Sequence, residues 1–147
     1  MDWKLNALED LRCYPHRKES LESMRDKIEA LQAQYTSIKA QATDTAPVQG
    51  GASHYEDRLL NNIVERDRLK INYRVAKTMV DIVERGLAGL TKDEAHILME
   101  FAAAGRRDKG VADRLATGMH MDRSTVYRIM GEARYKFTIA CYGIVDL

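Results

Sequence analysis

Six apolar side chains recur at alternating steps of three and four residues in the first third of the chain: Leu21, Met24, Ile28, Leu31, Tyr35 and Ile38. This heptad spacing gathers one narrow apolar stripe along an α-helix, and such a stripe is buried against a second helix. It predicts a helix over residues 16–42. The pattern covers fewer than three heptads, and it leaves open whether the partner helix belongs to the same chain or to another copy.

A segment rich in helix-breaking residues, T-D-T-A-P-V-Q-G-G-A-S-H, occupies residues 43–54 and predicts a flexible linker. A second long helix is expected over residues 55–89, with these residues near one face: Leu60, Val64, Ile71, Val75, Thr78 and Ile82. A helix of that length spans roughly 50 Å and must bury its apolar face, most simply against the preceding helix as an antiparallel coiled-coil hairpin. Its surplus of apolar surface also favours a homo-oligomer.

The N-terminal residues carry a short apolar stripe of their own, at Trp3, Leu5, Leu8 and Leu11. It predicts a helix over residues 2–13. We expect Pro15 to end this helix, because proline lacks a backbone N–H and disfavours helix at the residue before it. Residues 1–42 are therefore expected to hold this short helix and the heptad helix. The short helix is expected to fold back on the hairpin or to dock on a partner chain.

The last third of the chain, residues 90–147, predicts a small helical domain. Thr91 and Glu94 have the spacing of a capping box, so a helix is expected over residues 92–104. Two further helices are expected over residues 109–118 and 122–142. Small or apolar residues stand where two helices that cross steeply after a tight turn need them: Leu115, Ala116, Met119, Met121, Val126 and Ile129.

His120 falls at the turn position that often takes a left-handed backbone, and Asp122 is expected to cap the next helix through its carboxylate. A helical wheel gives that helix an apolar inner face: Val126, Ile129, Met130, Ala133, Phe137 and Ala140. The outer side of its first two turns carries Arg123, Ser124, Tyr127 and Arg128. A recognition helix reads the major groove of DNA with residues so placed. An ordinary helical hairpin with a polar outer face would show the same spacing.

Basic residues concentrate in the same part of the chain. Residues 105–136 hold eight Arg or Lys and four Asp or Glu, whereas residues 1–104 hold 15 basic and 17 acidic residues. A local excess of positive charge in an otherwise near-neutral chain is typical of a DNA-binding module. We expect contacts to DNA phosphates from the basic residues Arg106, Arg107, Lys109 and Arg114, and from the hydroxyl group of Thr125. A solvated helical face would give the same count of charges.

The run D-R-S-T-V-Y-R-I-M-G-E-A-R-Y-K-F resembles the last helix-turn-helix of sigma-70 region 4. Over roughly residues 21–142 the chain more closely resembles phage and prophage transcriptional regulators of the RinA/ArpU group. The most specific parts are A-P-V-Q-G-G, L-T-K-D-E-A-H-I-L-M-E-F and R-S-T-V-Y-R.

The resemblance implies an all-α fold, in which a long helical hairpin precedes a sigma-region-4-like helix-turn-helix domain at residues 90–147. It also implies a regulator of phage late genes. In sigma-like domains the positions of Arg123, Ser124 and Arg128 contact bases. Ser124 replaces the acidic residue common there, so the preferred DNA sequence stays open.

The sequence contains no arrangement of residues that indicates an enzyme. The four histidines, at positions 16, 54, 96 and 120, are scattered, and Cys13 and Cys141 match no metal-ligand spacing. Gly50-Gly51 is not followed by the G-K-[ST] of a phosphate loop. We expect no catalytic residues, metal or cofactor. No apolar run approaches the roughly 20 residues of a membrane span, and we expect reduced thiols in a bacterial cytoplasm.

Together these patterns predict a sequence-specific transcriptional regulator that binds double-stranded DNA, acts as a homo-oligomer and activates phage packaging or structural genes. Two alternatives stay open. One is a DNA-packaging assembly protein like the small terminase subunits of phages. The other is a sigma-like module that binds host RNA polymerase. The operator, the oligomer number, and the choice between activation and repression are not determined by the sequence.

Overall fold

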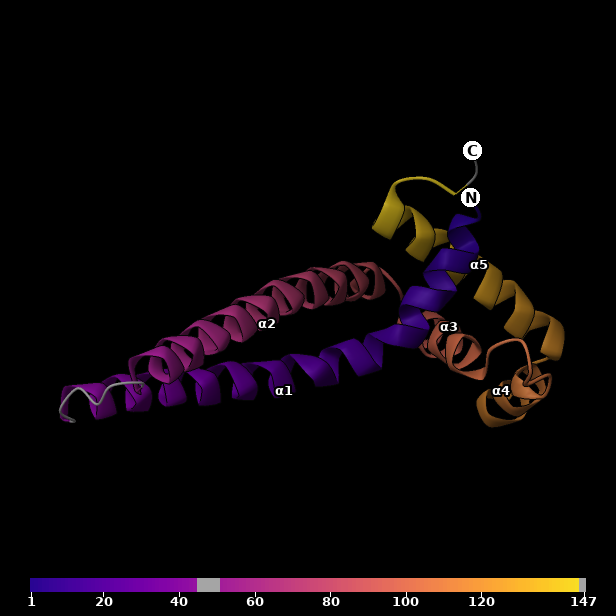
Figure 1. Ribbon diagram of the computed structural model, residues 1–147. Helices are drawn as coiled ribbons and strands as arrows, with labels where there is room; N and C mark the ends of the chain where they lie inside the picture. The colour runs from indigo at the N-terminus through magenta and orange to yellow at the C-terminus, as the bar shows by residue number, and fades with distance from the viewer. Residues whose placement is uncertain (45–50, 146–147) are drawn as a thin grey trace. The chain divides into compact units, whose positions relative to one another are not determined.

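The computed structural model describes the backbone of residues 1–44 and 51–145, and the side chains of residues 1–41 and 54–145. This part of the chain forms helices and no strand (Figure 1), which confirms the expected all-α class. The helices are α1 (Trp3–Asp44), α2 (Gly51–Ala88), α3 (Lys92–Ala104), α4 (Val111–Met119) and α5 (Arg123–Tyr142). Among the described residues, none of the helices has a stretch apolar enough to cross a membrane.

The expected helix end at Pro15 is wrong, because α1 continues through this residue. A proline inside a helix costs one backbone hydrogen bond and crowds the preceding turn. Contacts outside this helix hold the turn before the proline in place. Leu11 is fully buried, and the Tyr14 hydroxyl donates a 2.9 Å hydrogen bond to the carboxylate of Glu84. These tertiary contacts offset the energetic cost of the proline, whereas the expectation from the sequence considered that cost alone.

The expected linker over residues 43–54 is shorter than predicted. Helix α1 extends to Asp44 and α2 begins at Gly51, so both ends of the segment are helical. A glycine is tolerated at a helix start, because the first N–H groups have no partner within the helix. The other linker residues, 45–50, lie outside the described part of the chain.

The contacts divide the chain into two compact units, residues 18–77 and residues 1–17 with 78–147. This division differs from the expected one, which joined residues 1–17 to the heptad helix and began the small domain at residue 90. Both α1 and α2 pass from one unit into the other. The reason lies in the side chains near these boundaries, because Ala7 and Leu11 of α1 share a buried cluster with Val83 of α2.

In the unit of residues 18–77, α1 and α2 contact each other along opposite chain directions. The Asn62 amide donates a 2.8 Å hydrogen bond to the carbonyl of Leu31, and Arg25 lies 2.9 Å from the Tyr73 hydroxyl. The six heptad positions of α1 are buried or half-buried, and all other residues from 22 to 37 are exposed. The heptad stripe is therefore packed within this chain.

The face of α2 that meets α1 is not the one expected. Leu60, Val64, Ile71 and Val75 are exposed, and the contacts to α1 come from the other side of the helix. There Arg66 stacks over the Tyr35 ring at 4.8 Å. The remaining side chains of this inner face are mixed in polarity: Leu59, Asn62, Leu69 and Tyr73. A count of aliphatic residues misses such a face, because Arg and Tyr bury their apolar parts while keeping a polar tip.

The unit of residues 1–17 and 78–147 has one core cluster that joins α1, α2, α3 and α5. Its buried members are Ala7, Leu11, Val83, Leu98, Ala102, Ala133 and Phe137. The Trp3 ring lies 5.1 Å from the Tyr142 ring at the edge of the cluster, so Trp3 is a packing anchor, as its position in the apolar stripe indicated. The N-terminal helix segment thus completes the core of this unit.

Gly86 is buried within α2, two residues before the helix ends at Ala88. A Cβ atom at this position would lie 2.8 Å from the Phe137 ring and 2.8 Å from the Cys141 sulfur. Close approach between α2 and α5 therefore requires glycine here.

We predict that Gly86→Ala lowers the free energy of unfolding by about 1–3 kcal/mol, the usual cost of overpacking a core. The measurement is urea denaturation followed by circular dichroism. Gly131→Ala is the matched control, since a Cβ there meets no atom within 4 Å. It should raise stability by roughly 0.5–1 kcal/mol through helix propensity. Equal effects of the two changes would contradict the packing role of Gly86.

Candidate nucleic-acid interface

A second buried cluster positions α4 and α5 on α3. Its buried members are Ile97 of α3, Val111, Ala112 and Leu115 of α4, and Val126 of α5. Val126 and Ile97 are fully buried, so the first turns of α5 are fixed from beneath by close packing. The small and apolar positions that predicted the turn between the two helices lie in or against this cluster.

Three residues connect α4 to α5 (Figure 1). His120 has φ 55° and ψ 48°, which confirms the expected left-handed backbone at this position. Asp122 precedes α5 in an extended conformation, but its carboxylate makes no capping hydrogen bond, so that part of the expectation is wrong. The carboxylate is exposed, and its negative charge still lies at the positive end of the helix dipole.

Helix α3 is tied to α5 by Glu94. Thr91 and Glu94 form the expected capping box, with 3.2 Å from the Glu94 amide to the Thr91 hydroxyl. The second carboxylate oxygen of Glu94 accepts a 2.9 Å hydrogen bond from Lys136 of α5. This bond to Lys136, together with the Thr91 donors, lowers the pKa of Glu94 against the opposing effect of burial. The contact to Lys136 was not visible as a pattern, because the two residues lie 42 positions apart.

The outer side of the first two turns of α5 carries the four residues predicted to contact bases: Arg123, Ser124, Tyr127 and Arg128. All four are exposed. Arg123 lies 3.6 Å from the Asp113 carboxylate of α4, and Arg128 lies 3.2 Å from Glu132 one turn along α5. Exposed pairs of this kind contribute about 0–1 kcal/mol, so both guanidinium groups can exchange these partners for stronger ones.

Tyr127 has one protected side and one free side. Its ring lies 5.8 Å from the Phe101 ring of α3, and the Arg123 guanidinium lies 5.6 Å from it. Tyr127 nonetheless keeps 43% of its surface exposed. The ring is thus in contact with α3 while part of the side chain stays exposed.

The segment between α3 and α4 carries the predicted phosphate-contacting residues Arg106, Arg107 and Lys109, all exposed. Asp108 shapes this segment, because its carboxylate accepts hydrogen bonds from the Gly110 amide at 3.0 Å and from Arg114 at 2.7 and 3.1 Å. Arg114 and the Gly110 amide lower the pKa of Asp108. The spacing Asp-x-Gly before a helix is a known turn signal and could have indicated this arrangement.

Arg114 is therefore engaged within the protein, unlike Arg106, Arg107 and Lys109, for which the structure gives no ion pair with a described residue. Thr125 is half-buried on the first turn of α5.

Two positions farther along α5 differ from the expected inner face. Ala140 is exposed, and Thr138 is fully buried, where its hydroxyl donates a 2.6 Å hydrogen bond to the Arg134 carbonyl.

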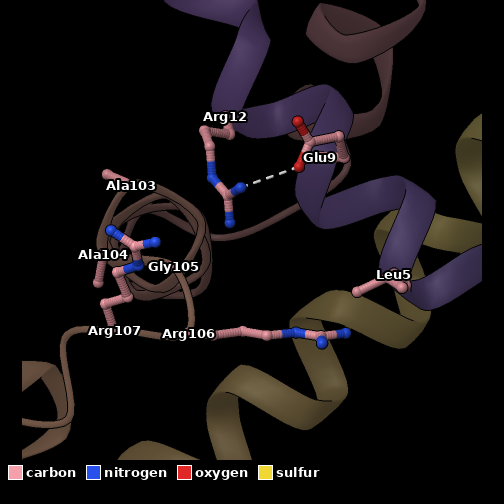
Figure 2. A pocket seen from close by; sticks show the side chains of 8 residues that line it. All are labelled: Leu5, Glu9, Arg12, Ala103, Ala104, Gly105, Arg106 and Arg107. Atoms are coloured by element: carbon pink, nitrogen blue, oxygen red, sulfur yellow. Dashed lines mark hydrogen bonds and ion pairs between the residues drawn. The ribbon is translucent and has the colours of Figure 1, made fainter.

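A hollow of about 520 Å³ opens beside this segment (Figure 2). It is lined by Leu5, Glu9 and Arg12 of α1 and by residues 103–107. Arg12 donates a 2.9 Å hydrogen bond to Glu9 and a 3.1 Å hydrogen bond to the Ala102 carbonyl at the end of α3. Its charge is therefore balanced, whereas Arg106 and Arg107 leave the hollow basic.

Phe101 connects the hollow to the outer side of α5. With Arg106 it lines a smaller adjoining pocket, and its ring also contacts Tyr127. The basic segment and the first turns of α5 thus belong to one neighbourhood of the surface. Among the described side chains, no group of three His, Cys, Asp or Glu is placed to hold a metal ion.

Comparison with models of known protein families, with curated proteins and with solved structures finds no match to this chain. Any function must therefore be argued from the residues and their geometry.

We predict that Glu94→Gln lowers the free energy of unfolding by about 1 kcal/mol at neutral pH, because it removes a charged partner of Lys136. A carboxylate with a lowered pKa stabilises the fold above its ordinary pKa, and this contribution is lost as the pH falls through the folded-state value. The difference between wild type and variant should therefore shrink in acid. Urea titrations at several pH values measure it. Glu100→Gln, at an exposed position of the same helix, should show a smaller and flatter difference. A pH-independent Glu94→Gln effect would refute the electrostatic explanation.

Proposed function

We propose that this protein is a sequence-specific regulator of transcription that binds double-stranded DNA through α5. The observation that carries the proposal is the set of exposed residues Arg123, Ser124, Tyr127 and Arg128 on the first two turns of a helix whose opposite side packs against α3 and α4. The N-terminal turns of a recognition helix enter the major groove. A rigid helix with long polar side chains at that end suits this role, because base reading requires fixed geometry.

Arg128 and Arg123 are the residues we assign to base recognition. An arginine can donate two hydrogen bonds to O6 and N7 of guanine, and each such contact discriminates by about 1–3 kcal/mol. Their present partners, Glu132 and Asp113, are exposed carboxylates that release them at low cost. Ser124 and Tyr127 offer hydroxyl groups for base edges or phosphates.

Arg106, Arg107 and Lys109 are the residues we assign to the phosphate backbone, with Arg114 and Thr125 as further contacts. Basic side chains on a segment between helices position a protein on DNA without reading its sequence. Each neutralised phosphate releases counterions, so affinity must fall with rising salt. Arg114 would have to exchange Asp108 for a phosphate, and we expect its contribution to be the smallest of the basic residues.

In this proposal α4, the turn and α5 act as a sigma-region-4-like helix-turn-helix, and the unit of residues 18–77 acts as a coiled-coil hairpin that joins copies of the protein. The resemblance to phage and prophage regulators makes late packaging or structural genes the proposed targets in a bacterial cytoplasm, with host RNA polymerase as a further partner. No catalytic role, metal or cofactor forms part of the proposal.

The experiment that tests the function is retention of a pool of genomic DNA fragments by the full chain over a series of salt concentrations, followed by sequencing of the retained DNA. One enriched site upstream of structural or packaging genes, lost steeply with salt, is the expected result. Enrichment inside a packaging gene would favour a small-terminase-like assembly protein instead. No retention at low salt would contradict DNA binding and turn attention to RNA polymerase.

We predict that Arg128→Ala relaxes base preference at one position of the enriched site by about 1–3 kcal/mol, because a bidentate contact is lost. Competition between the site and its single-base variants measures the change. Arg85→Ala, at an exposed position of α2 in the same unit, is the control and should leave the preference intact. Full discrimination by Arg128→Ala would refute its assignment to base reading.

We predict that Arg106→Ala weakens binding to all DNA sequences by a similar factor and reduces the slope of log affinity against log salt by about 0.9, the value of one phosphate contact. Fluorescence anisotropy at several salt concentrations measures the slope on specific and on unrelated DNA. An unchanged slope with lower affinity for the specific site alone would contradict the phosphate assignment.

A further inference from the structure

The outer face of α2 carries the exposed apolar stripe of the unit of residues 18–77. Leu60 is 59% exposed, Val64 52%, Ile71 59% and Val75 54%, and the other large hydrophobic residues of this unit whose side chains are described are at least half-buried. At 100° per residue, the four side chains lie within about 60° of one another around the helix. They turn away from the inner face, where Asn62, Leu69 and Tyr73 meet α1. Such a stripe marks a surface for another helix.

The stripe is symmetric about one point of the helix, between Asp67 and Arg68. Val64 lies as far before this point as Ile71 lies after it, and Leu60 as far before it as Val75 after it. Two copies of α2 in antiparallel alignment about this point would place Val64 opposite Ile71 and Leu60 opposite Val75, each pair occurring twice. A two-fold dimer interface requires this kind of self-complementary surface.

The charges beside the stripe are ordered about the same point. Glu65 and Asp67 precede it, and Arg68 and Lys70 follow it. Asp67 and Arg68 flank the stripe within about 50° of its centre. Glu65 and Lys70 lie farther round the helix, where Glu65 lines a hollow with Leu31 of α1. All four side chains are exposed, and the structure gives none of them an ion pair with another described residue. In an antiparallel pair the acidic half of one helix lies beside the basic half of the other. A parallel pair would instead bring the two acidic halves together, so the order of charges selects the antiparallel alignment.

Helix α1 offers no comparable surface in this unit. Its exposed residues from 22 to 37 are polar, charged or alanine. A partner helix with its own apolar stripe therefore fits α2 and not α1. Among the described side chains of this unit, only the outer face of α2 combines an apolar stripe with complementary charges beside it.

We infer that two copies of this chain associate through the outer faces of their α2 helices, antiparallel and centred between Asp67 and Arg68. The inference specifies the surface for the oligomer that the proposed function includes, and it does not require that the protein bind DNA. The contact buries Leu60, Val64, Ile71 and Val75 of both copies. It places Asp67 of one copy beside Arg68 of the other, and the charges of Glu65 and Lys70 act across the contact from farther round each helix.

Sedimentation equilibrium of the full chain tests the inference. The wild type should be a dimer in the micromolar range. Ile71→Lys should raise the dimer dissociation constant by about tenfold or more, because it places a charge in the apolar stripe. The double variant E65Q/D67N should also weaken the dimer, since it removes complementary charges. In a parallel dimer the same variant would tighten association, and that result would overturn the antiparallel alignment.

Charge reversal gives the sharpest test. The variants E65K/D67K and R68E/K70E should each dissociate, because like charges then face each other across the contact. An equimolar mixture of the two should recover a heterodimer, since the basic face of one meets the acidic face of the other. The control E22K/D26K makes the same change of charge on the polar face of α1 and should leave the wild-type dimer intact.

A monomeric wild type, a dimer indifferent to Ile71→Lys, or a mixture that stays monomeric would overturn the inference. Circular dichroism checks that each variant remains helical. DNA retention by the same proteins separates the two proposals. A wild-type monomer that retains DNA overturns this inference and leaves the proposed function standing. A dimer that retains no DNA contradicts the proposed function and leaves this inference standing.

Discussion

The contact of the Phe137 ring with Gly86 is the interaction on which the unit of residues 1–17 and 78–147 depends. The ring is fully buried, and it approaches the α2 backbone so closely that even a methyl group at Gly86 would collide with it. Around it lie Leu11 of α1 and Leu98 of α3. One aromatic side chain of α5 thus brings together helices from both ends of the chain, and a buried aromatic residue contributes strongly to such a core.

This core leaves the outer side of the first turns of α5 exposed. The C-terminal half of α5 supplies Phe137 and Thr138 to the interior, while the N-terminal half is held through Val126 on Ile97 and Leu115. One helix therefore anchors the unit at one end and presents Arg123 and Arg128 at the other. This division suits the proposed function, because a surface that reads DNA bases must be exposed and yet rigid, and packing of the opposite side supplies the rigidity.

Charged residues serve two different purposes in this protein. Asp108 with Arg114 and Glu94 with Lys136 hold segments in place, and their partners lie within the same unit. Arg106, Arg107 and Lys109 have no such partners among the described residues. The same distinction separates the charges of α2, where Arg66 stacks on Tyr35, whereas Glu65, Asp67, Arg68 and Lys70 are exposed and form no ion pair with a described residue. Charges without an internal partner are the ones to which we assign external partners.

The sequence by itself determined the helical class, the capping box at Thr91, the left-handed turn at His120 and the end of α5 at Gly143. These features depend on hydrogen bonds and backbone preferences within a few residues, so local spacing is sufficient to predict them. The exposed position of Arg123, Ser124, Tyr127 and Arg128 followed from helical periodicity in the same way.

Only the tertiary structure decided that α1 continues through Pro15, that Asn62, Arg66 and Tyr73 form the inner face of α2, and that Gly86 serves close packing. Each of these outcomes depends on a contact between residues far apart in the chain: Tyr14 with Glu84, Asn62 with Leu31, Gly86 with Phe137. Local propensity favours the opposite outcome at Pro15 by about 3 kcal/mol or more, and the burial of Leu11 and the hydrogen bond of Tyr14 to Glu84 oppose that cost. At these positions the contacts between distant residues, and not the local backbone preferences, therefore determined the structure.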